Sequence, residues 1–291
     1  MLLPGVEIID PRALLATIHA DLATVTDTRA ARAIVVRHLA EAKAAGNAIL
    51  AAAFGARPLE ARALTRAQSH LTDGLVSLAF DLARNHFHPV PNPTASERLT
   101  VLAVGGYGRA EMAPFSDVDL LFLTPWKITG WAESVIETML YILWDLKLKV
   151  GHSSRALRDC VRLGREDITI RTALLESRYL TGDSALAKEL DDTLWAELFR
   201  NTGPEFIEAK LAERADRHKR QGGQRYVLEP NVKEGKGGLR DLQTLYWIGK
   251  YLHRVNDPAG LVGAGLLTQE EYATFTRAEN FLWAVRCHLH Y

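Results

Sequence analysis

The chain has 291 residues, of which 47% are hydrophobic and 24% charged, and 35 Lys plus Arg balance 35 Asp plus Glu. The balanced charge argues against a dedicated nucleic-acid-binding protein, and no run of 18 or more apolar residues is present to span a membrane. Two cysteines, Cys160 and Cys287, and a beginning without signal-peptide features exclude a disulfide scaffold and fit a reducing cytoplasm.

The first 95 residues are predicted to form helices. Asp10 followed by Pro11 is typical of a helix start, because the aspartate can cap the helix and proline suits its first turn. A second helix is expected to begin near Asp27. A third is expected from about residue 60 to residue 86, where leucines recur at helical spacing; they are Leu64, Leu71, Leu75, Leu78 and Leu82.

A glycine turn between two apolar strands is the most informative feature of the chain. Residues 99–104 are apolar enough for a buried strand, which Gly105 and Gly106 end abruptly. After ten further residues, a second strand covers 117–123 and begins with Asp117 and Asp119. Because strand side chains alternate, both carboxylates point to the same face.

Two neighbouring carboxylates repel each other, and a divalent cation removes that repulsion. Mg²⁺ is held by one or two carboxylates together with substrate phosphates, and the backbone N–H groups of a glycine turn suit a phosphate. The stretch therefore predicts a metal-bound nucleoside triphosphate between the glycines and the two aspartates. The alternative is a β-hairpin with two solvated aspartates at its edge.

This pattern resembles the signature of the polymerase-β-like nucleotidyltransferase superfamily. The resemblance implies an α+β fold, with a small mixed-sheet nucleotidyltransferase core flanked by N- and C-terminal helical bundles. In the superfamily a later strand often carries a third carboxylate, but the strand expected at 148–154, beside the first two, carries none. The third acid stays open between Asp159, Asp167 and Glu176. Arg155 is either a phosphate contact or a surface arginine.

Four further helices are expected, at residues 130–147, 166–182, 184–199 and 204–221. The second of these is expected to end at Gly182, because glycine is common just after a helix C-terminus. The last is rich in charge and has a local excess of basic residues.

The second informative stretch, Glu229 to Ile248, is a glycine-rich basic loop that enters an apolar helix near Gly238. Glycines permit close backbone approach, basic side chains supply positive charge, and the helix N-terminus directs its N–H groups at the loop. This predicts an anion site, with a flexible linker as the alternative. The residues concerned are Lys233, Gly235, Lys236, Gly237, Gly238 and Arg240.

Together the two stretches resemble the bifunctional uridylyltransferase/uridylyl-removing enzymes that modify the nitrogen-regulatory protein PII. The resemblance implies Mg²⁺-dependent transfer of UMP from UTP to a tyrosine of PII, with no nucleic-acid or membrane partner. Asp117 and Asp119 would be the catalytic metal ligands. The nucleotide would be bound by Gly105, Gly106, Arg109, Ser116, Lys233, Lys236, Gly237, Gly238 and Arg240. The alternatives are an adenylyltransferase acting on glutamine synthetase and a non-catalytic regulatory module.

The expected division of the chain is a helical region at 1–95, a nucleotidyltransferase core at 96–185, and a helical domain at 186–291 that contains the basic loop 229–241. The family is known for an HD hydrolase domain and two glutamine-sensing ACT domains further along. No His-Asp doublet occurs in this sequence, so the chain is expected to be truncated before the HD domain.

Overall fold

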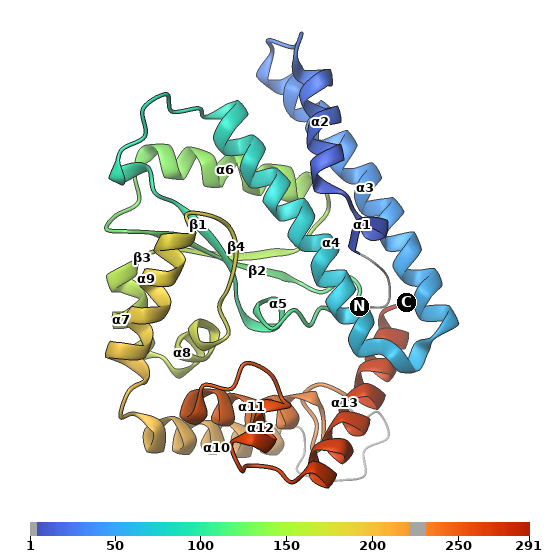
Figure 1. The fold of residues 1–291 in the computed structure, drawn as a ribbon, viewed down its shortest axis with the longest axis vertical. Helices are drawn as coiled ribbons and strands as arrows, with labels where there is room; N and C mark the ends of the chain where they lie inside the picture. The colour runs from blue at the N-terminus through green and yellow to red at the C-terminus, as the bar shows by residue number, and fades with distance from the viewer. Residues whose placement is uncertain (1–4, 221–230) are drawn as a thin grey trace.

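The computed structural model describes residues 5–220 and 231–291, shown in Figure 1. The chain begins with helices, and two predicted helix starts are confirmed: the Asp10 carboxylate accepts from the N–H groups of Arg12 and Ala13, and the Asp27 carboxylate accepts from the N–H of Ala30. These first elements are α1 Gly5–Ile8, α2 Pro11–Leu22, α3 Thr28–Ala56, η1 Pro58–Glu60, α4 Ala61–Leu82, η2 Ala83–Phe87 and η3 Ala95–Glu97.

A four-stranded mixed sheet lies at the centre of the described chain, in the order β3-β2-β1-β4. The strands are β1 Thr100–Ala103, β2 Val118–Thr124, β3 Val150–Ala156 and β4 Arg178–Gly182. β1 is antiparallel to β2, with Leu102 opposite Leu121, while β3 runs parallel to β2. The expected α+β class is confirmed. The third strand was expected beside both of the first two, but it pairs with β2 alone, because β4 occupies the other edge of β1.

The helix predicted at residues 166–182 is wrong in its second half. The structure has α8 Ile168–Leu175 and then β4, which the sequence analysis did not predict. β4 pairs with β1, and the Arg178 guanidinium forms a two-bond ion pair with Asp73 on α4. The hydrogen bonds to the edge of β1 and the ion pair with Asp73 outweigh the local preference of these residues for helix, as tertiary contacts often do.

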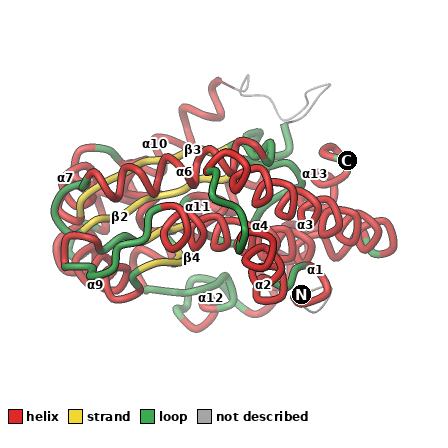
Figure 2. The backbone as a smooth tube through the Cα atoms, turned by 90° about the horizontal axis from the view of Figure 1, so that it is seen from above, coloured by secondary structure: helices red, strands yellow, loops and turns green. Residues whose placement is uncertain are grey.

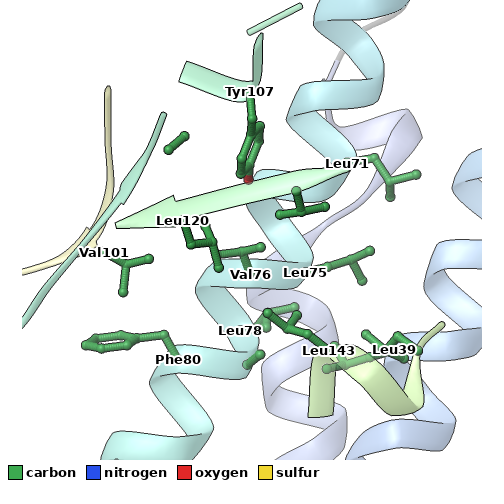
Figure 3. Close-up of a cluster of buried hydrophobic side chains, with 14 of the residues drawn as sticks. Leu39, Leu71, Leu75, Val76, Leu78, Phe80, Val101, Tyr107, Leu120 and Leu143 are labelled. Carbon is green, nitrogen blue, oxygen red and sulfur yellow. The ribbon is translucent and has the colours of Figure 1, made fainter. Parts of the chain in front are cut away.

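Helices cover both faces of the sheet, and the alternation of strand side chains divides the core in two. On one face Val101 and Leu120 pack with leucines of α3, α4 and α6 Gly130–Asp145, as Figure 3 shows. On the other face Leu102, Leu121 and Leu123 pack with α8, α7 Leu157–Glu166 and α9 Ser184–Leu194. We call these the first and second core clusters.

The last helices lie at one end of the sheet and enter different core clusters. They are η4 Trp195–Phe199, α10 Gly203–Arg220, α11 Leu239–His253, α12 Gly260–Gly263 and α13 Gln269–His290. α11 contributes Tyr246 and Trp247 to the second cluster, whereas α13 returns beside α4 and contributes Trp283 and Cys287 to the first (Figures 1 and 2). No helix in the described ranges combines the length and apolar character that crossing a bilayer requires.

Candidate functional site

The predicted glycine turn is a short helix, α5 Gly105–Gly108, that leaves β1 directly. Gly105 has a φ of +60°, in the left-handed region where a side chain is strained. Gly108 is packed so tightly that a Cβ atom would overlap the carbonyl oxygen of Glu176. The turn is therefore fixed in place, with Gly105 and Gly106 on the wall of a pocket.

The two predicted aspartates lie in the same pocket. Asp119 is in β2, and Asp117 is the residue just before this strand begins. Val118, between the two, is buried in the first core cluster. Within the described residues neither carboxylate has a hydrogen-bond or ion-pair partner. Burial raises the pKa of Asp119, and the charge of Asp117 raises it further, whereas Lys233 opposes the shift. An uncommitted, mutually repelling pair of this kind suits a divalent cation.

The pocket encloses about 390 Å³, a size suited to a nucleotide-sized ligand. Its walls come from several separate parts of the chain: α5 with the following loop, the start of β2, the residue before β3, the end of α8, the basic loop with α11, and α13. The lining residues include Gly105, Gly106, Arg109, Ser116, Asp117, Asp119, Lys149, Glu176, Lys233, Arg240, Gln243, Trp283, Arg286 and His290.

Arg109 is held at the end of α5 by two carboxylates. Its Nε donates to Glu111 at 2.7 Å, and its Nη1 donates to Glu176, which also accepts from the indole N–H of Trp247. Burial alone would lower the pKa of Arg109, but the charges of Glu176 and Glu111 outweigh it and raise the pKa. Because its charge is already balanced by Glu111 and Glu176, the main role of Arg109 is to hold α5, α8 and α11 together, and it has little charge left for a ligand.

Glu176 is the only one of the three candidates for the third acid that lines this pocket. Asp159 forms an exposed ion pair with Arg162, and Asp167 caps α8 through the N–H groups of Thr169 and Ile170. No group of three or more His, Cys, Asp or Glu suited to a metal is found among residues 5–220 and 231–291. Arg155 lines a neighbouring pocket of about 280 Å³ that shares Gly105 and Asp119 with the first.

The predicted basic loop is brought to the site only in part. Lys233 and Arg240 line the pocket, and the Asn231 side chain holds the loop by accepting from the N–H groups of Lys233 and Glu234. Burial is the main cause that lowers the pKa of Lys233. Glu229 and Pro230, the start of the predicted motif, lie outside the described residues.

The remaining loop residues, Gly235, Lys236, Gly237 and Gly238, do not line the pocket. The N–H of Gly237 donates instead to the carboxylate of Asp241, which also accepts from Arg217 and His218. A carboxylate of the protein therefore occupies the position at the start of α11 where the sequence predicted an external anion.

Sequence reasoning missed the wall made by α13. Trp283, Arg286 and His290 line the pocket with the aspartates, although they lie far from them along the chain. In the sequence they form part of an ordinary amphipathic helix, with no glycine turn or acidic pair beside them. Only the packing of α13 against α4 brings them to the site, so no local signal could have identified them.

Comparison with known proteins gives a consistent relationship. Residues 205–291 match the model of the GlnD PII-uridylyltransferase family. The whole chain is 70% identical to 32% of a bifunctional uridylyltransferase/uridylyl-removing enzyme of Cereibacter sphaeroides. The enzyme of the same name from Ruegeria pomeroyi is 60% identical over 97% of this chain, a stretch that makes up 31% of that enzyme. The one from Rhodospirillum rubrum is 51% identical over 98% of this chain, which corresponds to 30% of that enzyme. The chain thus spans about a third of the length of these relatives, and the resemblance predicted from the two motifs is confirmed.

Proposed function

From this relationship to the bifunctional uridylyltransferase/uridylyl-removing enzymes, we propose that the chain carries the uridylyltransferase activity. It would transfer UMP from UTP to a tyrosine hydroxyl of PII in a metal-dependent reaction. The observation that carries the proposal is the uncommitted pair Asp117 and Asp119 in one pocket with the glycine turn. The base and PII are inferred from the names of the relatives and family, and the tyrosine is inferred from the family resemblance of the two motifs.

Asp117 and Asp119 fit Mg²⁺, because two carboxylates without partners in the described structure leave the other coordination positions to phosphate oxygens. When bound, the metal would supply charge neutralisation and orientation at the α-phosphate. Gly105 and Gly106 would bind phosphate oxygens, with Ser116 and Arg109 beside them, while Lys233 and Arg240 would face the negative charge of the triphosphate.

In the proposed reaction the tyrosine oxygen forms a bond to the α-phosphorus, and the bond from that phosphorus to the bridging oxygen breaks. Pyrophosphate leaves, and uridylylated PII is the second product. The hydroxyl proton leaves to solvent, and Asp117 and Asp119, which would hold the cation, would lower the barrier to its removal. The ion pairs of Arg109 with Glu111 and Glu176 would hold the glycine turn at a fixed position relative to Asp117 and Asp119.

The transferase half is the extent of the proposal, because the chain spans only about a third of its relatives. An adenylyltransferase that acts on glutamine synthetase is the second candidate, since the pocket residues alone do not select uracil over adenine. A non-catalytic module is disfavoured, because an inactive site has no need for two repelling carboxylates. Both cysteines are free and buried, which supports a reducing compartment such as the cytoplasm.

The test is to incubate the purified chain with PII, Mg²⁺ and either UTP or ATP and to weigh PII by intact-protein mass spectrometry. We expect a mass gain of one UMP per PII subunit with UTP and no gain with ATP. A gain of AMP, or modification of glutamine synthetase in place of PII, would establish the second candidate. No modification of either protein would contradict the proposed activity of this chain.

A further inference from the structure

Arg286 on α13 is a half-buried cation that lines the site and has no carboxylate partner among the residues that the structure describes. It lines the pocket of Asp117 and Asp119, and its guanidinium lies 5.2 Å from the centre of the Trp283 ring. Within the described ranges no Asp or Glu oxygen lies within 4.0 Å of it. A guanidinium that lies over an aromatic ring keeps its N–H donors available to a ligand.

Other cations surround Arg286 in the same pocket. Burial lowers the pKa of Lys233, and the charges of Arg240 and Arg286 lower it further. Burial likewise lowers the pKa of Arg286, to which Arg240 and Arg109 also contribute.

The nearby carboxylates do not balance this charge. Glu111 and Glu176 are paired with Arg109. Glu234 is shared between Lys233, Arg240 and Arg217, at 3.8, 3.3 and 3.9 Å. Counted over the described residues, the group formed by Lys233, Arg240 and Arg286 therefore keeps an excess of positive charge in a half-buried place, which an anionic ligand would neutralise.

Arg286 is also held in a fixed position. Four residues further along α13, the His290 Nδ1 atom donates to the carbonyl oxygen of Pro114 at 2.5 Å, in the loop that leads to Asp117. Towards the start of α13, Glu279 pairs with Arg62 of α4 at 3.1 Å. Since α13 is anchored on both sides of Arg286, the arginine stays at a set place relative to the aspartate pair.

We propose that Lys233, Arg240 and Arg286 form the subsite for the β- and γ-phosphates and hence for the leaving pyrophosphate. The inference rests on the proposed function for the position of the α-phosphate, which belongs at the aspartate pair. Lys233, Arg240 and Arg286 line the same pocket as Asp117 and Asp119, so a ligand whose α-phosphate lies at the aspartates has these three cations around its remaining phosphates. A polyphosphate carries the negative charge that such a group of cations would neutralise, and guanidinium groups bind its oxygens in pairs.

The subsite makes α13 part of the nucleotide site. Arg286 would stabilise the charge that develops on pyrophosphate as the bond to the α-phosphorus breaks. A ligand with β- and γ-phosphates would join α13 to α5 and β2, whereas a nucleoside monophosphate would reach only α5 and β2.

The test compares Arg286→Gln with a matched control, Arg277→Gln, on the same helix. Arg277 is outside the pocket, and among residues 5–220 and 231–291 its guanidinium bonds only to Thr274, one turn away. Titration calorimetry with Mg²⁺ present would measure the affinities for pyrophosphate, inorganic tripolyphosphate and UMP. For Arg286→Gln we expect pyrophosphate and tripolyphosphate to bind about tenfold more weakly or worse, since a charge-assisted hydrogen bond is lost. UMP should bind unchanged, and Arg277→Gln should match the original chain.

Unchanged pyrophosphate affinity in a folded Arg286→Gln chain would overturn the inference, as would an equal loss for UMP. If that variant does not fold, two others replace it. Lys233→Gln should cause a large loss of pyrophosphate affinity, and the charge-conserving Arg286→Lys should cause a small one. Binding needs no acceptor protein, so the two proposals fail separately. If the chain binds pyrophosphate through Arg286 but modifies no protein, only the proposed activity is refuted. If the chain uridylylates PII but Arg286→Gln does not weaken pyrophosphate binding, only the subsite is refuted.

Discussion

At the scale of single residues, the pocket contains two kinds of carboxylate. Glu111 and Glu176 are committed to Arg109, and Glu176 also accepts from Trp247, so their charges are used within the protein. Asp117 and Asp119 have no such partner in the described chain. Removing a committed carboxylate leaves a buried guanidinium unpaired and is expected to destabilise the fold. Removing the uncommitted ones should act on function alone.

Changing Asp117→Asn together with Asp119→Asn should abolish UMP transfer and leave the fold intact. The substitutions remove the charge repulsion and the cost of burying a charged group, which together raise the pKa of Asp119, so the free energy of unfolding should stay equal or rise slightly. Intact-protein mass spectrometry of PII and urea unfolding of the chain measure the two effects. Retained transfer would refute the metal assignment, and a collapse of stability would show that the pair is structural.

Two glycines of similar appearance should respond in opposite directions to alanine. Gly108→Ala should reduce the free energy of unfolding by about 2 kcal/mol or more, because its Cβ overlaps the backbone of Glu176. Gly55→Ala, near the end of α3 with nothing within 4 Å of the added atom, should stabilise by roughly 0.5–1 kcal/mol. Urea titrations of both variants check this, and equal effects would contradict the tight contact between α5 and Glu176.

Spacing allowed the sequence to predict Asp117, Asp119 and the two glycines as a group, because a turn and a strand place residues by local geometry. Arg286 and His290 could not be predicted this way, since their position depends on how α13 packs against α4. The loop glycines show the opposite case: a local pattern predicted an anion site at the start of α11, but the protein's own Asp241 accepts the N–H of Gly237 there.

At the scale of elements, helix starts and the first two strands followed from capping residues and apolar runs, whereas β4 did not. Its residues, Arg178 to Gly182, pair with β1 and are anchored to α4 through Asp73. Neither β1 nor Asp73 is close to these residues in sequence. Contacts between distant parts of the chain therefore decided between helix and strand, and the local sequence pattern does not reveal such contacts. The same kind of long-range contact joins α13 to α4, where a buried glutamate lies between the helices.

That glutamate, Glu279, should make stability depend on pH. Burial raises its pKa to about 7, and Glu111 adds to this, although Arg62, Arg109 and Arg66 oppose it. Because the folded pKa exceeds the ordinary 4.5, the folded state holds an extra proton between these values. The stabilising contribution is full below about pH 4.5 and is lost as the pH rises through about 7.

Glu279→Gln should remove that slope, which amounts to about 3 kcal/mol at most. The difference in unfolding free energy between the original chain and the variant, measured by urea titration from pH 5 to pH 8, should therefore favour the original chain more at low pH. Groups that titrate equally in both chains cancel in this difference. A difference that is constant with pH would contradict the raised pKa.

At the scale of the whole molecule, the site lies where the two core clusters meet. β1 and β2 contribute to both, α11 joins the second through Trp247, and α13 joins the first through Trp283 and Cys287. The pocket takes residues from α5, β2, α11 and α13, so its geometry depends on both halves of the core together. A ligand that contacts all four elements should stabilise all four.

Pyrophosphate with Mg²⁺ should therefore slow amide hydrogen exchange in two segments that are remote in sequence, 105–109 and 283–290. At a hundred times its dissociation constant it should also raise the free energy of unfolding by about 2.7 kcal/mol. UMP with Mg²⁺ should protect 105–109 without protecting 283–290, because it lacks the phosphates proposed to reach Arg286. Exchange measured by mass spectrometry at matched saturation separates the two ligands. Protection of 283–290 by both would mean that α13 responds to closure around Asp117 and Asp119 rather than to the leaving group.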